Sequence, residues 1–343
     1  MQLLFKKLLP QPLKLPTFIP MPMKKVVVIG GGTGNFTVLS GLKNYNLDLS
    51  AIVSMADDGG STGILRDELG VLPPGDVRQC LVALSDSSRL MRGLMNYRFE
   101  NGGLGGHSFG NLLLSALEKV TGSFEKAVEE AGRILSIKGK VIPVTTNPVR
   151  LKMILSNSKV LEGEKEVHLS TEIHRGYKSI YLEPFPEVNK RAIDEIMNAD
   201  AVILGPGGMY TSLIPNLLVD GISKSLRDTQ AKKIFIVNLI NKKGQTPKFK
   251  VGDHLREIQR YIGKDIFDYV LVNNGKPAKE LLAAYSEEGD PVENDLHDPR
   301  IIHADLVSNA LKEVQKGDTL QRNLIRHDQE KLASELMKIV AHL

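Results

Sequence analysis

The run Gly30-Gly31-Gly32-Thr33-Gly34 is the first stretch of the sequence whose residue types suit ligand binding. It follows the apolar run Val26-Val27-Val28-Ile29 and precedes residues with helical spacing. Glycines let backbone amides point at one centre and let a ligand approach closely. The N-terminus of the following helix also favours an anion. We therefore expect the amides of Gly31, Gly32, Thr33 and Gly34 to cradle phosphate, with a purely structural turn as the alternative.

This loop meets the dinucleotide-binding pattern Gly-x-Gly-x-x-Gly only in part. Counting from Gly30, the sixth position is Asn35, and counting from Gly32 it is Thr37. The lysine of a P-loop is also missing, because Asn35 and Phe36 follow Gly34. The incomplete pattern counts against a nicotinamide-dependent oxidoreductase.

The pair Asp57-Asp58 follows a second apolar run, Ala51-Ile52-Val53-Ser54-Met55. Ligands bind at the carboxyl ends of the strands in open α/β sheets, and neighbouring strands lie ~4.8 Å apart. The pair and the first glycine loop are therefore expected to face one ligand. Asp57 and Asp58 suit a Mg²⁺ ion that offsets a diphosphate, or a ribose hydroxyl. A simple turn is the alternative.

A second glycine turn, Gly205-Pro206-Gly207-Gly208, follows the apolar run Ala201-Val202-Ile203-Leu204. Hydroxyl groups and free amides at the start of the next helix again suit an anion. Two such loops favour a ligand with spread charge, such as a nucleotide-sugar, although one of them could be only a turn. The candidate ligand residues here are Gly205, Gly207, Gly208, Tyr210, Thr211 and Ser212.

Five more polar residues are candidates for ligand binding. Asp76 is placed to cap a helix after Pro73-Pro74-Gly75, with Gln79 reaching back to it. Arg78 pairs with a phosphate or with a surface carboxylate. The run His107-Ser108-Phe109-Gly110-Asn111 offers the other three, His107, Ser108 and Asn111. Ser108 suits a helix cap, and a lone histidine is more often structural than catalytic. No zinc-like group of histidines and cysteines occurs in the sequence.

The elements that must position these residues follow an α/β pattern. Apolar runs at 26–29, 51–55, 201–204, 234–237 and 269–272 predict strands buried on both faces of a parallel sheet. Apolar residues at helical spacing predict helices over 188–197, 214–226 and 328–343. The predicted fold class is a Rossmann-like α/β fold, with a mostly parallel sheet and helices on both faces.

The segment of about 140–186 has a different, β-rich character. Lys140–Val144 reads as a strand, and Met153–Leu155 with Lys159–Leu161 reads as a small hairpin. We expect a β-rich insertion inside one domain that spans residues 24–343.

The charge balance excludes one class of partner. Five of the 44 basic residues and none of the 40 acidic residues lie in the first 25 positions, which leaves 39 basic and 40 acidic residues. The folded body is therefore near neutral, tryptophan is absent, and aromatic residues are few. A nucleic-acid-binding surface needs a basic stripe or stacking aromatics, so we expect no nucleic-acid partner.

Residues 1–23 contain five prolines and only short apolar runs. A spanning helix needs ~20 apolar residues, and a secretory signal needs a long apolar stretch before its cleavage site. We expect a disordered extension, or a start at Met21 or Met23; a weak basic surface that touches a membrane or a partner is the alternative. Cys80 is the single cysteine, so no internal disulfide forms, and we expect a cytoplasmic protein.

Five spaced motifs resemble the bacterial gluconeogenesis factor family. The motifs are Val28–Gly34, Ala56–Gly63, Gly70–Arg78, Gly106–Leu113 and Leu204–Ser212. They occur in the family's order and cover about residues 24–275. Five motifs in order are far more specific than one glycine loop.

This family is related to 2-phospho-L-lactate transferase. The resemblance implies a Rossmann-like fold with a cleft between the glycine loops. For gluconeogenesis factors it implies binding of UDP-sugars and a role in cell shape and cell-wall growth on gluconeogenic carbon sources. For the transferases it implies Mg²⁺-assisted transfer of a phospholactyl group from a guanosine diphosphate conjugate to a flavin-type alcohol. Asp57 and Asp58 match the paired acidic motif of the transferases.

The chain departs from the family in the segment Asn241-Lys242-Lys243-Gly244-Gln245-Thr246. The family has a Gln-Pro-Gly-Glu-Thr segment there, so an acid is lost and two lysines are gained. Our hypothesis is a UDP-sugar-binding regulatory protein, with a phospholactyl-type transferase as the alternative. The sequence leaves open whether a reaction is catalysed and whether the chain forms a homo-oligomer.

Overall fold

The computed structural model describes residues 23–285, 289–308 and 325–343. The extension predicted for residues 1–23 lies outside these ranges except for Met23. The strands are β1 (Lys24–Gly30), β2 (Leu47–Val53), β3 (Lys140–Pro143), β4 (Arg150–Leu155), β5 (Val160–Glu162), β6 (Tyr177–Glu183), β7 (Ala201–Leu204), β8 (Lys232–Ile236), β9 (Tyr269–Asn273) and β10 (Ile301–Ala304).

The α-helices are α1 (Gly32–Leu42), α2 (Gly60–Leu69), α3 (Gly75–Leu84), α4 (Arg89–Asn96), α5 (Phe109–Thr121), α6 (Phe124–Ile134), α7 (Glu164–Leu169), α8 (Lys190–Met197), α9 (Ile214–Leu217), α10 (Ile222–Asp228), α11 (Val251–Ile262), α12 (Lys279–Tyr285) and α13 (Gln329–Val340). Two 3₁₀ turns, η1 (Gly102–Leu104) and η2 (Ile173–Arg175), and one π-helical turn, η3 (Met209–Leu213), complete the described elements.

The predicted parallel sheet is confirmed. Seven strands lie in the order β10-β9-β8-β7-β1-β2-β3, and every neighbouring pair is parallel. The chain first moves outward from β1 to β3 and then returns to the other side of β1 with β7. The order therefore reverses between β1 and β7, which is the switch point where α/β sheets bind ligands. Ile29 pairs with Leu204 there, so both strands end side by side.

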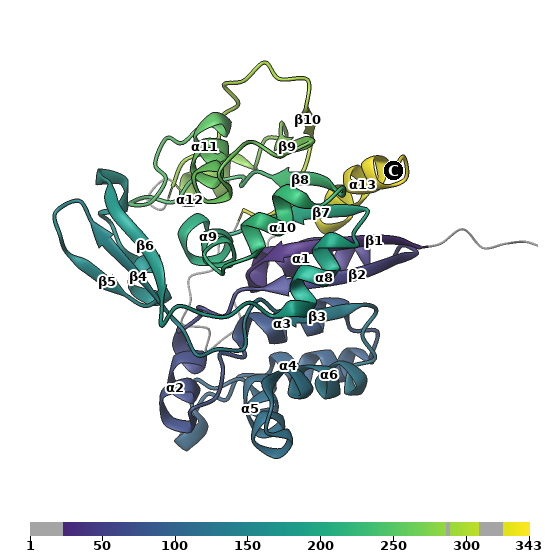
Figure 1. Ribbon diagram of the computed structural model, residues 1–343, viewed down its shortest axis with the longest axis vertical. Helices are drawn as coiled ribbons and strands as arrows, with labels where there is room; N and C mark the ends of the chain where they lie inside the picture. The colour runs from purple at the N-terminus through teal and green to yellow at the C-terminus, as the bar shows by residue number, and fades with distance from the viewer. Residues whose placement is uncertain (1–22, 286–288, 309–324) are drawn as a thin grey trace, which may run out of the picture.

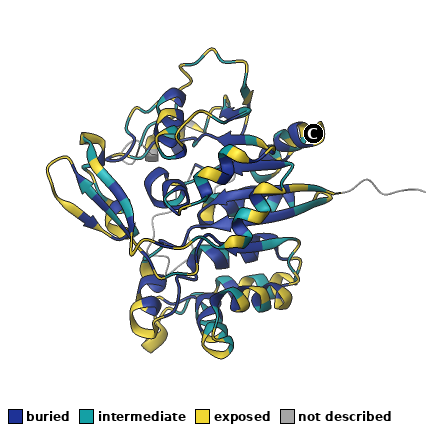
Figure 2. Ribbon diagram, viewed as in Figure 1, coloured by how far each residue is buried: buried dark blue, intermediate teal, exposed yellow. Residues whose placement is uncertain are grey.

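The central strands form the core because their apolar residues face helices on both sides. Val26–Ile29 are at most 1% exposed, and Ala201–Leu204 at most 2%. Figure 2 shows these strands as buried, with exposure concentrated on outer helices and loop tips. Continuous β-branched runs, rather than alternating ones, suit this double-sided burial.

Helices cover both faces of the sheet, as predicted. Helix α1 packs against α3 and α13, and a second group is formed by α8, α10 and α11. Figure 1 shows α8 and α10 in front of the sheet. Helices α1 and α3 both begin near the carboxyl ends of β1 and β2, so their first turns are brought to the same edge.

A small antiparallel sheet stands beyond the carboxyl ends of the main strands, at the left of Figure 1. Its order is β5-β4-β6, and Met153 pairs with Leu161 as the hairpin predicted. Strand β3 pairs with β2 in the main sheet, so the β-rich sheet begins at Arg150 rather than at residue 140.

Other predicted boundaries were wrong for local reasons. The helix expected over 214–226 is divided into α9 and α10, because Gly221 adopts a φ of 91° between them. Strand β2 runs from Leu47 to Val53 rather than over 51–55. Strands β6 and β10 and helices α2, α4, α7, α11 and α12 were not predicted. Of the helices in the described part of the chain, none is both long and apolar enough to cross a membrane.

Gly41 sets the distance between α1 and α13. A Cβ on Gly41 would overlap the Gln329 carbonyl oxygen and lie 2.7 Å from the Ala333 Cβ. We expect Gly41→Ala to lower the free energy of unfolding by about 1–3 kcal/mol, as overpacking does. Gly93→Ala in α4 is the matched control, because its Cβ meets nothing within 4 Å. The control should be neutral or up to ~1 kcal/mol stabilising. Urea denaturation measures both, and equal effects would contradict the packing argument.

Candidate functional site

The two glycine turns lie against each other at the switch point. A Cβ on Gly34 would overlap the Pro206 carbonyl oxygen, and a Cβ on Gly31 would lie 2.6 Å from Ser212 Oγ. Only glycine allows backbones to approach this closely. The turn after β1 and the turn after β7 therefore form one continuous surface of peptide groups.

Two asparagines that the sequence had not singled out hold the second turn. Asn238, after β8, accepts from Gly207 N at 3.0 Å and donates Nδ2 to Gly207 O at 2.8 Å. Asn216 Nδ2 donates to Gly30 O at 3.0 Å and to Ser212 O at 2.8 Å. The amide of Asn216 thus joins the end of β1 to the start of η3.

Asp57 reaches the same surface from the end of β2. Its Oδ1 accepts from Gly59 N at 2.9 Å, and its other oxygen lies against Gly75 at the start of α3. The side chain is partly exposed. Burial raises the pKa of Asp57, while the Gly59 amide and the Thr62 hydroxyl oppose the rise.

The prediction that Asp76 caps α3 was wrong. Pro74 is the N-cap residue, so Asp76 lies within the first turn and turns its carboxylate towards β1. The amide of Gly32 donates to that carboxylate. Gln79 instead accepts from Thr33 Oγ1 at 3.1 Å. The Gly32 amide, which we expected to bind phosphate, therefore already donates to the carboxylate of Asp76.

Asp58 points away from its neighbour, towards the small sheet. Its Oδ1 accepts from Lys165 N at 2.7 Å, and its Oδ2 lies against Gly163. Burial raises the pKa of Asp58 first, opposed by the Lys165 amide and by Arg66. Asp58 therefore fixes α7 to the end of β2.

This contact places Glu164, a fourth carboxylate, at the site. Burial and then repulsion from Asp57, Asp76 and Asp58 raise the pKa of Glu164 well above its usual value. Burial and then the charge of Asp57 raise the pKa of Asp76 to about 8. The sequence held no signal for Glu164, because only the folded insertion brings it there.

Two cations face this acidic group. Arg66 is 9% exposed and lowers the pKa of both Asp57 and Asp58. Lys242 lowers the pKa of Glu164 and donates Nζ to His168 O. Lys242 belongs to the segment that departs from the family. That segment therefore contacts α7, one turn from Glu164.

Four predicted residues form a buried network beneath α2. Arg78 is 5% exposed and donates Nε to Asn111 Oδ1 at 2.8 Å. Asn111 Nδ2 donates to Ser61 Oγ at 3.3 Å, which lies 3.0 Å from His107 Nδ1. Ser108 caps α5, as predicted. Arg78 is not a surface cation, and the network holds the start of α2.

Tyr210 and Thr211 are also buried. The Tyr210 ring meets the Tyr177 ring edge-on at 5.5 Å between centroids, and Tyr177 OH donates to Glu257 of α11. Tyr210 thus connects η3 to the small sheet. A π-helical turn such as η3 is uncommon and often occurs at functional sites.

The carboxylates suit a magnesium ion shared with a ligand. Within residues 23–285, 289–308 and 325–343, no three or more His, Cys, Asp or Glu side chains are grouped to hold a metal by themselves. Mg²⁺ is usually held by one or two carboxylates together with phosphates and water. Asp57 and Asp76 offer such oxygens. Burial first, and then repulsion from a neighbouring carboxylate, raises the pKa of each, and a divalent cation would relieve that repulsion. The donor set therefore fits Mg²⁺.

The family comparison agrees with this geometry. The model of the family described as 2-phospho-L-lactate transferase CofD matches residues 26–340. The chain belongs to this family. The CofD-family chain is similar to the gluconeogenesis factor of Bacillus subtilis, with 36% identity over 92% of this chain and 98% of the relative. The gluconeogenesis factor of Halalkalibacterium halodurans is 37% identical over 88% and 94% of the two chains.

A crystal structure supports the same placement. A UPF0052 family member from Bacillus halodurans has a TM-score of 0.83 and 35% identity, and covers 92% of this chain and 99% of its own. The resemblance to gluconeogenesis factors is thus confirmed at the level of family and fold.

Asp76 should make stability depend on pH. Its pKa in the folded protein, about 8, lies well above the ordinary value of an aspartate, 3.8. The folded state then holds the proton more tightly, so stability present at low pH is lost as pH rises towards 8. We expect Asp76→Asn to lose less unfolding free energy between about pH 5 and pH 8 than the unchanged protein. Urea denaturation across this range tests it.

The matched control for this experiment is Asp86→Asn, which changes an exposed aspartate. It should keep the slope of the unchanged protein. A slope that Asp76→Asn leaves unaltered would show that the carboxyl of Asp76 is not held in its neutral form.

Proposed function

We propose that the protein binds a nucleotide-sugar, with UDP-sugars as the favoured class, and acts as a regulatory protein in cell shape and cell-wall growth. The observation that supports this is the contact between the two glycine turns at the switch point. Together they offer peptide amides from two helix starts to one ligand. A diphosphate has its charge spread over two groups and suits two adjacent sets of donors.

The nearby carboxylates make binding depend on a cation. A diphosphate beside Asp57 and Asp76 would meet like charge, and repulsion in a partly buried site is strong. When bound, Mg²⁺ would neutralise charge on the phosphates and on these carboxylates. Asp57 and Asp76 would hold the ion, and the freed Gly32 amide would donate to a phosphate oxygen. Asp58 would keep α7 in place.

The regulatory role rests on the likeness to gluconeogenesis factors. The relatives that carry this name match nearly their full length. The segment with Lys242 lies beside Glu164, so we expect it to influence which sugar is accepted.

Calorimetric titration tests the binding. UDP-N-acetylglucosamine, UDP-glucose, GDP and NADP are titrated with and without Mg²⁺. We expect saturable heat from a UDP-sugar that strengthens with Mg²⁺. A Cβ on Gly32 would lie 2.5 Å from Asp76 Oδ1 and 2.7 Å from Gln79 Nε2. Gly32→Val should therefore weaken binding at least about tenfold, roughly 1.4 kcal/mol.

Gly103→Val is the control, because a Cβ at this position meets nothing within 4 Å. It should bind as the unchanged protein does. Asp57→Asn should remove the Mg²⁺ effect. The absence of saturable heat from all four nucleotides, or an unchanged affinity in Gly32→Val, would overturn the proposal.

The matching family description favours one alternative, a phospholactyl transferase. In that reaction an acceptor hydroxyl oxygen attacks the phosphorus of the phospholactyl group, and the bond to guanosine monophosphate breaks. The proton of the hydroxyl leaves to a base. Incubation with a guanosine diphosphate conjugate of lactate and a flavin-type alcohol tests this. Release of guanosine monophosphate that is lost in Asp57→Asn would support the transferase; no release would leave the regulatory role.

A further inference from the structure

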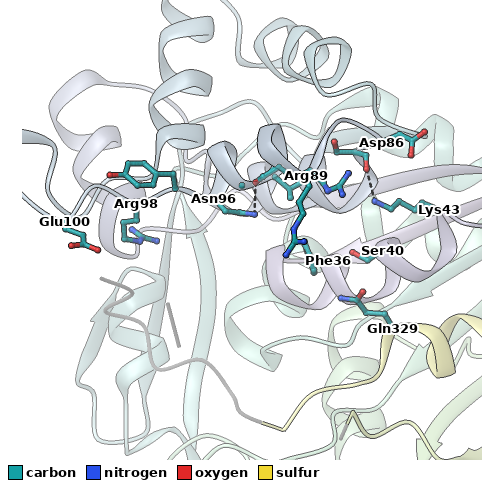
Figure 3. Close-up of a pocket in the computed structure, with 14 residues that line it drawn as sticks. Phe36, Ser40, Lys43, Asp86, Arg89, Asn96, Arg98, Glu100 and Gln329 are labelled. Atoms are coloured by element: carbon teal, nitrogen blue, oxygen red, sulfur yellow. Dashed lines mark hydrogen bonds between the residues drawn. The ribbon is translucent and has the colours of Figure 1, made fainter. Parts of the chain in front are cut away.

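A cavity of about 800 Å³ lies between α1, α4 and the start of α13. We call it the α4 pocket; its charged lining includes Lys43, Arg89, Arg92 and Arg98. Figure 3 shows Arg98 and Glu100 at one end, Lys43 and Asp86 at the other, and Arg89 between them. None of these residues takes part in the glycine-turn site.

The pocket has an excess of positive charge. Its four basic side chains face two acidic ones, Asp86 and Glu100. Asp86 is already engaged outside the pocket, because Lys138 Nζ lies 3.3 Å from its Oδ2. The lining therefore has at least two cations more than the available carboxylates.

Neutral groups, rather than carboxylates, hold these cations in place. Lys43 Nζ donates to Ser85 O at 2.8 Å, and Arg98 donates to Gly106 O at 2.5 Å. Arg92 donates to Ser87 O. A carbonyl oxygen orients a cation without cancelling its charge. The groups are thus positioned in advance and keep their positive field.

Several arginines elsewhere on the described surface pair with carboxylates. Arg133, Arg191 and Arg300 each pair with a carboxylate at 3.0 Å or less. Arg89, in contrast, makes no ion pair with the described part of the chain. The α4 pocket therefore gathers in one cavity four cations, Lys43, Arg89, Arg92 and Arg98, that make no ion pair with the described residues.

The cations also crowd one another. Burial and then the charge of Arg92 lower the pKa of Lys43, and the charge of Asp86 opposes this in part. An anion placed between them would remove that repulsion and strengthen its own binding.

The size of the cavity and its apolar lining restrict the occupant. Sites for small molecules measure about 300–1,000 Å³ and combine apolar surface with a few polar groups. Phe36, Val82 and Tyr97 provide apolar surface beside the cations. This combination suits a compact molecule that carries phosphate.

We propose that the α4 pocket is a second ligand site, which binds a small phosphorylated molecule through Lys43, Arg89, Arg92 and Arg98. The four cations are separate from the glycine turns, although Phe36 in the lining lies one helical turn from Gly32. Helix α1 begins at Gly32 in those turns and reaches Lys43 after eleven residues, which is roughly 16 Å along its axis. The proposal does not depend on nucleotide-sugar binding, because it uses other residues.

Titration with inorganic pyrophosphate tests it, at about 0.15 M salt so that weak surface attraction is screened. Gly32→Val is used to block the glycine turns and isolate the pocket. In that background we expect one saturable pyrophosphate site. Adding Arg89→Ala and Arg98→Ala should weaken its affinity at least about tenfold, which corresponds to roughly 1.4 kcal/mol.

Arg133→Ala is the charge-matched control, because Arg133 is exposed on α6, outside the pocket. It should leave the affinity unchanged. Three results would overturn the proposal: no saturable binding in the Gly32→Val background, equal weakening by Arg133→Ala, or no effect of the paired arginine variants. Binding of a poly-glutamate peptide in place of pyrophosphate would overturn it in favour of a protein partner.

Discussion

The site depends on the contact between the turns that end β1 and β7. These strands are parallel neighbours, so their carboxyl ends meet at one edge of the sheet. Both turns are rich in glycine, and a Cβ on Gly34 would overlap the Pro206 carbonyl oxygen. The contact fixes where α1 and η3 begin. Asn216 then joins the end of β1 to η3 through Gly30 O and Ser212 O, and Asn238 holds Gly207 of the second turn to the end of β8.

The same edge concentrates negative charge from three separate parts of the chain. Asp57 comes from the end of β2, Asp76 from the first turn of α3, and Glu164 from the insertion. Like charges held this close disfavour their own ionised forms. A bound cation would therefore stabilise a fold that holds these carboxylates together. This links the amides, which suit phosphate, to the carboxylates, which suit the metal that accompanies it. Asp58 takes part by holding α7 rather than by facing the ligand.

Strands and the two turns could be predicted because their signals are local. Val26–Ile29 is apolar on both faces, and glycine follows it directly. The role of Asp76 could not be predicted in the same way. A capping pattern is also local, but Pro74 starts α3 earlier and turns the carboxylate to Gly32. Glu164 was missed because its position depends on the small sheet that stands beyond the carboxyl ends of the main strands. The α4 pocket was missed because its cations come from helices and a loop far apart in the sequence.

A crystal structure with UDP-N-acetylglucosamine and Mn²⁺ in place of Mg²⁺ tests the central claim most directly, since anomalous scattering locates the metal. The account predicts the diphosphate between Gly31–Gly34 and Gly207–Ser212, with the metal bound to Asp57. A nucleotide bound elsewhere, with the two glycine turns in contact only with each other and with solvent, would contradict it.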